Sequence, residues 1–406
     1  MTDIQKENKS GGKVPNNPKQ IPNLRFPEFE GEWEVKKLGE IATFSKGKGI
    51  SKSEIEENGI TECIRYGELY THYREVINEI KSRTNVDKSA LVLSEENDVI
   101  IPASGETTID IATASCVLKP GIALGGDLNI IKSKNDGVFL SYYLNSKKKM
   151  EIANLAQGIS VVHLYSSQLA SLSLSLPTNQ EQEKISTFLA KISERIDCSI
   201  KIIEGLKKLK VATAKKIFSQ ELRFKDDNGN DFPEWEVREV GEVFKITRGN
   251  VLAMNLVSNQ CNEKNTYPVY SSQTKNNGLA GYYTDFLFED AITWTTDGAN
   301  AGDVNYRSGK FYCTNVCGVL ISNEGYANSC IAELINSVSK NYVSYVGNPK
   351  LMNGVMSEIK IPFPSLPEQT KIANFLSAID SKIDMENQLL QKLEEQKKYL
   401  LQNMFV

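Results

Sequence analysis

Histidine is scarce in this sequence: the 406 residues include only two, His72 and His163. The sequence contains no HExxH, GxSxG or GxxxxGK[ST] motif, and no proline pair follows Asp or Asn as in the active sites of adenine methyltransferases. Carboxylates are plentiful, but none stands out by its spacing, so we interpret them as structural or solvating. These absences argue against a hydrolase, a nucleotide-driven enzyme or an adenine methyltransferase.

Cysteine is also sparse, and the seven cysteines follow no metal-binding pattern. Cys313 and Cys317 are separated by three residues and lack the second ligand pair of common zinc sites, so we expect them to pack in a core. An odd number of scattered cysteines predicts reduced thiols and a cytoplasmic protein. The cysteines are Cys63, Cys116, Cys198, Cys261, Cys313, Cys317 and Cys330.

Long apolar runs are missing, since none approaches the roughly 18 residues needed to cross a bilayer. Hydrophobic content of 40% and charged content of 24% are ordinary for a soluble protein. Residues 1–21 are polar, lack the apolar core of a signal peptide, and are expected to form a disordered tail. The length predicts two or three domains.

What the sequence does contain is a duplication. Trp33–Ile41 recurs as Trp235–Val243, and Leu176–Leu189 recurs as Phe363–Leu376. The shift is 202 positions at the front (235 minus 33) and 187 at the rear (364 minus 177), so the interiors differ by about 15 residues. A period this long excludes a solenoid, whose repeats run about 20 to 50 residues. The sequence predicts two modules with a shared frame and different interiors.

Each rear motif is expected to begin a long helix with a capping box, Thr178 with Glu181 in the first and Ser365 with Glu368 in the second. A heptad pattern then extends over about 38 to 40 residues, or roughly 60 Å of helix. The first helix places at its core positions Ile185, Leu189, Ile192, Ile196, Ile203, Leu206 and Ile217. The second places Ile372, Leu376, Ile379, Ile383, Leu390, Leu393, Leu400 and Met404. Polar residues interrupt both seams at matched positions, Ser199 with Glu386 and Lys210 with Lys397.

The connectivity predicts how the two helices are arranged. If each module starts and ends at neighbouring points, the second helix must run back antiparallel to the first. We therefore expect a mixed α/β fold class, with two α+β domains held apart by a pair of antiparallel coiled-coil helices and related by a pseudo-two-fold axis. The predicted boundaries are 22–176 and 221–363 for the domains, and 177–220 and 364–406 for the helices.

The module interiors read as short strands between turns. Apolar runs at Asp98–Pro102, Asn129–Ile131, Ala291–Trp294 and Gly318–Ile321 predict strands. Short helices are expected at Val138–Leu155 and at Ser329–Val346.

The net charge of −4 argues mildly against a nucleic-acid partner, but its distribution is uneven. Eight basic residues against two acidic ones lie between Lys201 and Lys225. This stretch is either a solvated helix face or a stripe that faces phosphates.

The duplicated frame, in which each variable interior ends in a proline and an EQxKIxxFL helix start, resembles the specificity subunits of type I restriction-modification systems. The resemblance covers Leu24–Val406 and is most specific at Glu181–Leu189 and Glu368–Leu376. It implies a non-catalytic, DNA-binding subunit in which each interior is a target recognition domain that reads one half of a bipartite target. It further implies that two modification subunits use S-adenosylmethionine to methylate adenine. Restriction and translocation would come from a separate subunit that uses ATP and magnesium, and this chain itself would bind no cofactor or metal.

Base recognition requires side chains that make paired hydrogen bonds, such as Arg or Lys to guanine and Asn or Gln to adenine. In the second interior the richest segment is Ser271–Gly278, followed by Thr295–Asn300 and then by Lys350 with Asn353. These segments supply the predicted contacts Ser271, Ser272, Gln273, Thr274, Lys275, Asn276, Asn277, Thr295, Thr296, Lys350 and Asn353.

The first interior offers parallel segments. Ser104–Thr108 follows a strand as Thr295–Asn300 does, and Gln157–Ser160 parallels the region near Asn353. Lys46–Gly49 aligns with Arg248–Gly249, where glycine lets the backbone approach a phosphate, although a plain turn fits equally well. The predicted contacts are Lys46, Lys48, Arg65, Tyr66, His72, Tyr73, Arg74, Ser104, Thr107, Thr108 and, in the second interior, Arg248. His163 is expected to pack or cap a helix and not to contact DNA.

Two other interpretations stay open. The chain could be a fused restriction enzyme that carries recognition domains, although it lacks methyltransferase and nuclease motifs. It could also be a coiled-coil scaffold for other proteins, which the acidic net charge favours.

Overall fold

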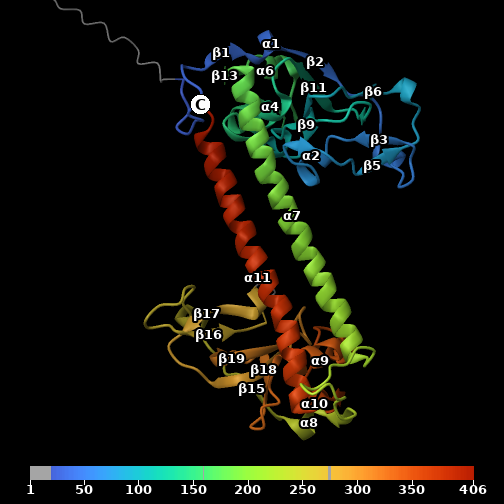
Figure 1. The fold of residues 1–406 in the computed structure, drawn as a ribbon, viewed down its shortest axis with the longest axis vertical. Helices are drawn as coiled ribbons and strands as arrows, with labels where there is room; N and C mark the ends of the chain where they lie inside the picture. The colour runs from blue at the N-terminus through green and yellow to red at the C-terminus, as the bar shows by residue number, and fades with distance from the viewer. Residues whose placement is uncertain (1–19, 159, 273–275) are drawn as a thin grey trace, which may run out of the picture. The chain divides into compact units, whose positions relative to one another are not determined.

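The structure is a computed structural model that describes residues 20–158, 160–272 and 276–406. The chain forms two compact units (Figure 1). Unit 1 comprises the residues up to Cys198 together with Leu389–Val406, and unit 2 comprises Ser199–Gln388. The helices α7 (Asn179–Phe218) and α11 (Leu366–Asn403) have 40 and 38 residues, and each contributes one part to each unit.

Unit 1 contains a five-stranded sheet in the order β2-β11-β7-β9-β4 and a four-stranded sheet in the order β5-β3-β10-β6, as counted over its described residues. Its strands are β1 Glu34–Lys37, β2 Ala42–Lys46, β3 Thr61–Ile64, β4 Val76–Ile77, β5 Ser82–Thr84, β6 Val92–Leu93, β7 Asp98–Pro102, β8 Ser104–Gly105, β9 Ser115–Val117, β10 Ala123–Leu124, β11 Leu128–Ser133, β12 Val162–His163 and β13 Ser173–Leu176. Its short helices are α1 Leu38–Ile41, α2 Glu68–Thr71, α3 Thr108–Ile111, α4 Gly137–Ser146, α5 Lys149–Leu155 and α6 Ser166–Ala170.

The core of unit 1 explains why β7 reads as an unbroken apolar run. All five residues of β7 are buried. Ile100 and Ile130 pack against Ile64 and Leu124 of the four-stranded sheet, while α4 covers β7 and β9. A strand with cover on both faces carries apolar residues at successive positions, here Val99, Ile100 and Ile101, so the alternation typical of half-exposed strands is absent.

Unit 2 is built around a six-stranded sheet in the order β15-β20-β18-β19-β16-β17, again as counted over the described residues. Its strands are β14 Glu236–Glu239, β15 Lys245–Arg248, β16 Tyr267–Tyr270, β17 Leu279–Tyr283, β18 Phe288–Thr295, β19 Val304–Cys313, β20 Cys317–Ile321 and β21 Lys360–Phe363. Its short helices are α8 Val240–Val243, α9 Ser329–Ser339 and α10 Asn353–Ser357.

The core of unit 2 lies between this sheet and α9. Trp294 and Leu320 pack against Ile331 and Ile335 of the helix. Asn328 caps α9, because its side chain accepts a hydrogen bond from the backbone N–H of Ile331 at 3.1 Å. The predicted strands and helices of both interiors are confirmed, except that α9 ends at Ser339 and does not reach Val346.

The shared frame closes each unit with one strand pair. The first strand of the frame pairs antiparallel with the last strand of the unit, β1 with β13 and β14 with β21. The next residue of the frame then begins a short helix, α1 or α8, that packs beside α6 or α10. A Cβ on Gly39 would lie 3.0 Å from Cβ of Ala170, and one on Gly241 would lie 3.0 Å from Cβ of Ser357. Glycine at both positions permits the same close approach.

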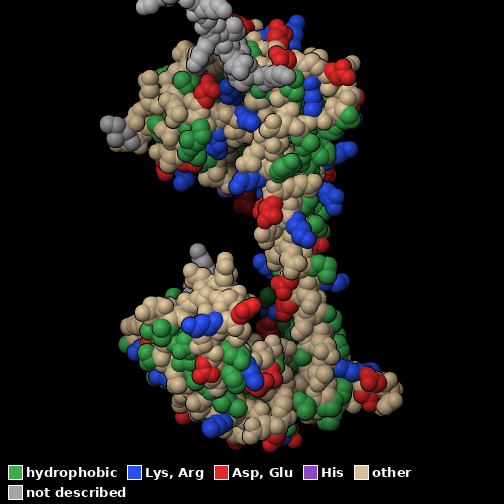
Figure 2. All heavy atoms as spheres, turned by 90° about the vertical axis from the view of Figure 1, so that its left-hand side faces the viewer, with side chains coloured by type: hydrophobic (Ala, Val, Ile, Leu, Met, Phe, Trp, Pro, Cys, Tyr) green, Lys and Arg blue, Asp and Glu red, His purple; other side chains and the backbone are tan. Residues whose placement is uncertain are grey.

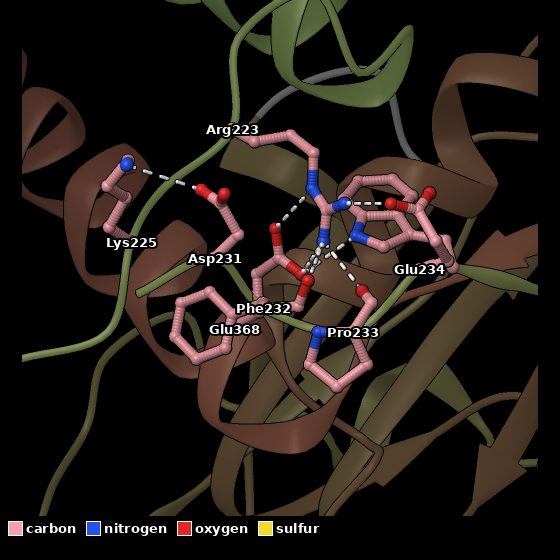
Figure 3. A network of polar contacts seen from close by, with 8 residues as sticks. Arg223, Lys225, Asp231, Phe232, Pro233, Glu234 and Glu368 are labelled. Atoms are coloured by element: carbon pink, nitrogen blue, oxygen red, sulfur yellow. Dashed lines mark hydrogen bonds and ion pairs between the residues drawn. The ribbon is translucent and has the colours of Figure 1, made fainter. Parts of the chain in front are cut away.

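A buried polar network joins each frame to its long helix. In unit 2 the Arg223 guanidinium faces the Glu368 carboxylate through two hydrogen bonds of 3.2 and 3.0 Å, and Trp235 Nε1 donates to the same carboxylate at 2.8 Å (Figure 3). In unit 1 Arg25 binds Glu181 through two bonds of 2.7 Å. These carboxylates raise the pKa of both arginines.

This network corrects the prediction of two capping boxes. Glu181 and Glu368 turn toward arginine and tryptophan instead of the backbone at the helix start. Thr178 still accepts a hydrogen bond from the Glu181 N–H at 3.4 Å. The Ser365 hydroxyl is buried without a hydrogen-bond partner in the described structure, so its predicted cap is wrong. An ion pair with a charged donor is stronger than a neutral cap, which accounts for the preference.

Within unit 2, α7 and α11 run antiparallel. Lys210 of α7 pairs with Asp380 of α11 at 2.9 Å. Ile217 lies later on α7 than Lys210, and it clusters with Ile372, which lies earlier on α11 than Asp380. In unit 1 Phe405, which follows α11, packs on α4, where its ring stacks on that of Tyr143 with the centroids 5.3 Å apart.

The predicted seam residues are buried except for Leu206 and Leu390, which are half-buried. The mixed α/β fold class with two long helices is confirmed. The predicted tail, residues 1–21, lies outside the described residues apart from Gln20 and Ile21. The Gln20 carbonyl accepts a hydrogen bond from the Trp33 N–H at 2.7 Å, so Gln20 is engaged in the fold of unit 1.

Candidate nucleic-acid interface

Three polar segments that are distant in the sequence meet in unit 2. Gly298 N donates to the Pro349 carbonyl at 3.0 Å, and Asp297 forms a β-bridge with Lys350. The Asn300 side chain reaches the Ser272 carbonyl at 3.4 Å. The structure therefore brings together the segments around Ser271, Thr295 and Lys350 that the sequence singled out separately.

Some of the predicted side chains in this cluster are exposed. Asn276, Asn277 and Lys350 are exposed, and Asn353 is half-buried. Arg248 at the end of β15 is exposed as well. These residues stay predictions as DNA contacts, and their side chains are accessible to a ligand. Gln273, Thr274 and Lys275 lie outside the described residues.

Other predicted side chains in unit 2 are engaged within the unit. Thr296 is fully buried and donates to the Val316 carbonyl at 3.0 Å. Thr295 is 8% exposed. The Ser271 hydroxyl lies 3.0 Å from that of Thr314, and Ser272 is half-buried. The side chains of Thr295 and Thr296 therefore belong to the core, because a residue that follows a buried strand starts inside the fold.

Unit 1 repeats the same bridge pattern. Ser104 of β8 pairs with His163 of β12, and Gln157 forms a bridge to His163. In unit 2 Asp297 and Ser344 form the corresponding bridges to Lys350. His163 and Lys350 lie 187 positions apart, the shift of the rear motif. The parallel between the two loop pairs is thus present in the backbone pairing.

His163 corrects a prediction. Its side chain is exposed and does not pack in a core or cap a helix. Its ring lies near that of Tyr165, with the centroids 6.4 Å apart. The repeat alignment of Val162–Tyr165 with Pro349–Met352 is the signal in the sequence that would have identified it as the counterpart of Lys350.

The other predicted residues of unit 1 lie in two places. Lys46 ends β2 and Lys48 lies on the segment that follows, and both are exposed beside Gly125 and Gly126. Gly125 N donates to the Ile64 carbonyl just before Arg65. A Cβ on Gly47 would lie 1.9 Å from the Gly125 carbonyl oxygen, so the turn requires glycine there. Arg65 and Tyr66 are half-buried.

Thr107 and Thr108 lie at the start of α3 with exposed side chains. Thr107 caps the helix by accepting a hydrogen bond from the Asp110 N–H at 3.1 Å. Ser104 is 6% exposed and belongs to the core.

Two members of the His72–Arg74 segment are engaged in the fold. The Tyr73 hydroxyl accepts a hydrogen bond from the Lys81 N–H at 2.9 Å, and burial raises the pKa of Tyr73 to about 12. Arg74 pairs with Asp197 of α7 at 3.5 Å. The predicted role of Tyr73 as a base contact therefore conflicts with its place against the core, whereas His72 is exposed.

At least half of the basic residues in the stretch Lys201–Lys225 pair with acidic side chains, and two of these residues, Lys210 and Lys216, lie on α7. Between Lys201 and Lys225, Lys210, Lys216, Arg223 and Lys225 form ion pairs. Figure 2 shows basic and acidic side chains interspersed on the face of each unit that is turned toward the viewer. The ion pairs of Lys210, Lys216, Arg223 and Lys225 favour the solvated helix face over a continuous stripe that faces phosphates.

No cluster of three or more metal-ligating side chains occurs in the part of the chain that the structure describes. Cys313 and Cys317 are buried in a core cluster with Phe311, and burial raises the pKa of the Cys317 thiol to about 11. Neutral thiols of this kind pack as small apolar groups.

Comparison with known families gives the context for these surfaces. The profile of the type I restriction modification DNA specificity domain matches residues 30–208 and again residues 233–395. The chain belongs to this family. The two matches reproduce the internal duplication, one domain match for each unit.

Relatives of this specificity chain agree with that assignment. A Mycoplasma pneumoniae protein that is named as a type I specificity subunit is 33% identical over 57% of this chain and 91% of its own length. The specificity subunit of the type I restriction enzyme MjaVIII from Methanocaldococcus jannaschii is 25% identical over 94% of this chain and 93% of its own length. Specificity subunits are the non-catalytic components of their complexes.

A solved structure shares the fold of the specificity chain. The type I restriction-modification S subunit from M. genitalium matches with a TM-score of 0.69 and 19% sequence identity, over 95% of this chain and 99% of that chain. None of the helices in the described residues is long and apolar enough to span a membrane.

Proposed function

We propose that this chain is the DNA-reading subunit of a type I restriction-modification complex, and that each unit recognises one half of a bipartite target. The observation that carries the proposal is the matched pair of bridges, Ser104 with His163 and Asp297 with Lys350. Both bridges present loops of different sequence on equivalent scaffolds. A protein that reads two unlike half-sites with one architecture requires this combination.

The exposed members of the candidate set are the residues that we assign to DNA contact. In unit 2 these are Arg248, Asn276, Asn277 and Lys350, and Asn353 lies at their edge. Asn can bond to adenine through paired hydrogen bonds, and Arg or Lys can bond to guanine or phosphate.

In unit 1 the corresponding exposed residues are Lys46, Lys48, His72, Thr107 and Thr108, and Arg65 is half-buried. The two units differ in kind: the unit 1 set is richer in lysine, and the unit 2 set is richer in asparagine. This difference supports recognition of two different base sequences.

The partners follow from the family. We infer that two modification subunits bind this chain and use S-adenosylmethionine to methylate adenine in each half-site. A restriction subunit that uses ATP and magnesium would cleave unmodified DNA. The complex would act in the cytoplasm, where the seven unpaired cysteines stay reduced.

Exchange of one interior tests the assignment of one unit to one half-site. Residues 235–363 are replaced by the equivalent span of another specificity subunit, and the hybrid is expressed with its modification subunit. Sequencing of methylated bases should show that one half of the target changes while the other half and its methylation persist. A change in both halves together would contradict the assignment.

Loss of sequence-specific methylation with this chain omitted, and its return on addition, separates DNA recognition from a scaffold role.

A further inference from the structure

Arg307 is a buried arginine of unit 2 that contacts the segment Ser271–Gly278, which carries candidate DNA contacts. Arg307 lies on β19 and is 8% exposed. Its guanidinium carbon lies 3.8 Å from the centroid of the Tyr270 ring. No described carboxylate forms an ion pair with it. A guanidinium buried without a counter-charge is unfavourable for stability unless other contacts offset the lost hydration. The contacts of Arg307 therefore have to offset this cost.

The hydrogen bonds of Arg307 indicate what it holds. Nε donates to the Thr293 hydroxyl at 3.1 Å, and Nη2 donates to the Asn277 carbonyl at 2.6 Å. The first bond fixes the guanidinium to the central strand β18. The second reaches the end of the polar segment that begins at Ser271. One planar group thus connects the sheet to the candidate DNA contact.

The backbone that Arg307 reaches has an uncommon conformation. Asn276 and Asn277 have φ values of 52° and 51°, in the left-handed region that residues with a side chain rarely adopt. Gly278 follows at φ 84°, and the Ser271 N–H donates to its carbonyl at 2.8 Å. Asparagine tolerates this region better than most residues with a side chain, and contacts with the rest of the unit further stabilise two in succession.

A polar cavity lies beside the same residues. It has a volume of about 150 Å³, and its lining includes Asn277, Thr295, Asn305 and Arg307. Most side chains of this lining are polar, so polar groups surround Asn277 on this side. The hydrogen bond from Arg307 to the Asn277 carbonyl and the bond from the Ser271 N–H to the Gly278 carbonyl therefore hold the segment.

We propose that Arg307 is a positioning residue that sets the conformation of Asn276 and Asn277, and thereby determines which bases unit 2 reads in its half-site. The inference rests on the proposed function. Arg307 acts through the exposed asparagines and does not itself touch DNA. Lysine cannot replace it fully, because an ammonium lacks the planar fork that stacks on Tyr270 while donating in two directions.

The test uses the methyltransferase complex reconstituted with the full chain. The variants are Arg307→Gln and Arg307→Lys, with Lys310→Gln, an exposed cation on the same strand, as the matched control. The substrates are duplexes in which each base of either half-site is varied one at a time. The ratio of kcat/KM for the cognate duplex to that for each varied duplex measures discrimination.

We expect Arg307→Gln to lower discrimination about tenfold at one or more bases of the unit 2 half-site, with less than a twofold change in the other half-site. Arg307→Lys should recover part of this loss, and Lys310→Gln should match the wild type. Equal slowing on every duplex, or altered discrimination in both half-sites, would overturn the positioning role and leave a purely structural one.

A second measurement covers the case in which Arg307→Gln does not fold. Hydrogen exchange of the peptide that contains Asn276–Gly278 should become faster in Arg307→Lys at an unchanged melting temperature. Unchanged exchange would contradict the proposal. If the wild-type complex discriminates at neither half-site, the proposed function has failed, and this outcome is distinct from failure of the role of Arg307.

Discussion

The two units agree where the frame meets the long helices and differ in what the frame encloses. Both use an arginine, a tryptophan and a helix-start glutamate in the same buried network. Unit 1 encloses sheets of five and four strands and the strand pair β8-β12, whereas unit 2 encloses one sheet of six, over the residues described. The comparison teaches that the closing contacts, and not the enclosed sheet, define the repeated architecture.

A second comparison concerns the matched lysines. Lys397 in unit 1 pairs with Glu75 at 2.9 Å and lies over the Tyr142 ring, while Lys210 in unit 2 pairs with Glu333 at 2.6 Å and Asp380 at 2.9 Å. Equivalent helix positions thus use acids from different places in the fold. The long helices supply the lysines, and each interior supplies a counter-charge, Glu75 in unit 1 and Glu333 in unit 2, to which α11 adds Asp380.

The largest expected effect comes from breaking the shared network. Glu181→Gln and Glu368→Gln should each destabilise their own unit by about 3 kcal/mol, because each leaves a largely buried guanidinium without its counter-charge. Urea unfolding followed by tryptophan fluorescence measures the loss, since Trp33 lies in unit 1 and Trp235 and Trp294 lie in unit 2.

Glu234→Gln is the matched control for the Glu368 variant. Glu234 also pairs with Arg223, but its side chain is 91% exposed, so the loss should stay below about 0.5 kcal/mol. Losses that differ widely between Glu181→Gln and Glu368→Gln would contradict the equivalence of the two networks.

Replacement of the matched lysines, Lys397 and Lys210, should destabilise the two units by different amounts. Lys397→Met is expected to cost about 2 kcal/mol, because the Glu75 side chain is only 15% exposed and would lose its partner. Lys210→Met should cost about 1 kcal/mol, since Asp380 and Glu333 are 49% and 33% exposed and can be hydrated. Urea unfolding of both variants checks the order, and an equal or reversed order would show that the exposure of the acids does not govern the effect.

A smaller effect is expected on DNA affinity from the equivalent residues Lys350 and His163. Affinity falls as salt rises, and Lys350→Gln should make the plot of log affinity against log salt less steep by about 0.9 if Lys350 neutralises one phosphate. His163→Lys should make the plot steeper by a similar amount, because it places a lysine at the same bridge of unit 1. Titration of the assembled complex with target DNA at several salt concentrations measures both slopes. Unchanged slopes would remove this pair from the interface.

The smallest expected effect is the alkylation of exposed cysteines, which leaves stability unchanged. Each unit contains one exposed cysteine, Cys198 in unit 1 and Cys261 in unit 2. Burial raises the pKa of Cys63 and of Cys317 to about 11, so their reactive thiolates are rare at pH 8. Iodoacetamide should label two thiols in the native chain, as counted by mass spectrometry. Labelling of Cys63 or Cys317 before unfolding would contradict their burial.

The fold was predictable from sequence to the extent that periodicity and repetition carry it. The run Asp98–Pro102 predicts a strand, and the heptads predict two helices of the observed length. The prediction of the capping boxes was wrong because a glutamate three residues after a cap residue can bond either to the backbone at the helix start or to a distant side chain. Its partner, Arg25 or Arg223, lies more than 140 positions away, and no local pattern points to it.

The candidate site was predictable only in part. Runs of Asn, Ser and Thr after strands identified the loops that the structure brings together, since polar turn residues follow buried strands. Which side chains point outward was not predictable: Thr296 is fully buried and Asn277 is exposed, although both belong to polar turns. Arg307 gave no signal at all, because a single arginine in a strand usually lies on the solvent side.

The sequence alone determined that this protein has two units, one frame and two long helices, because repetition and heptad spacing are properties of residue order. Only the tertiary structure decided that Glu181 and Glu368 bind arginine, that His163 occupies the position of Lys350, and that Arg307 supports the segment after Ser271. These pairings depend on which distant residues share a buried space. Burial strengthens such contacts and makes unpaired groups costly, so the packed fold selects the partners.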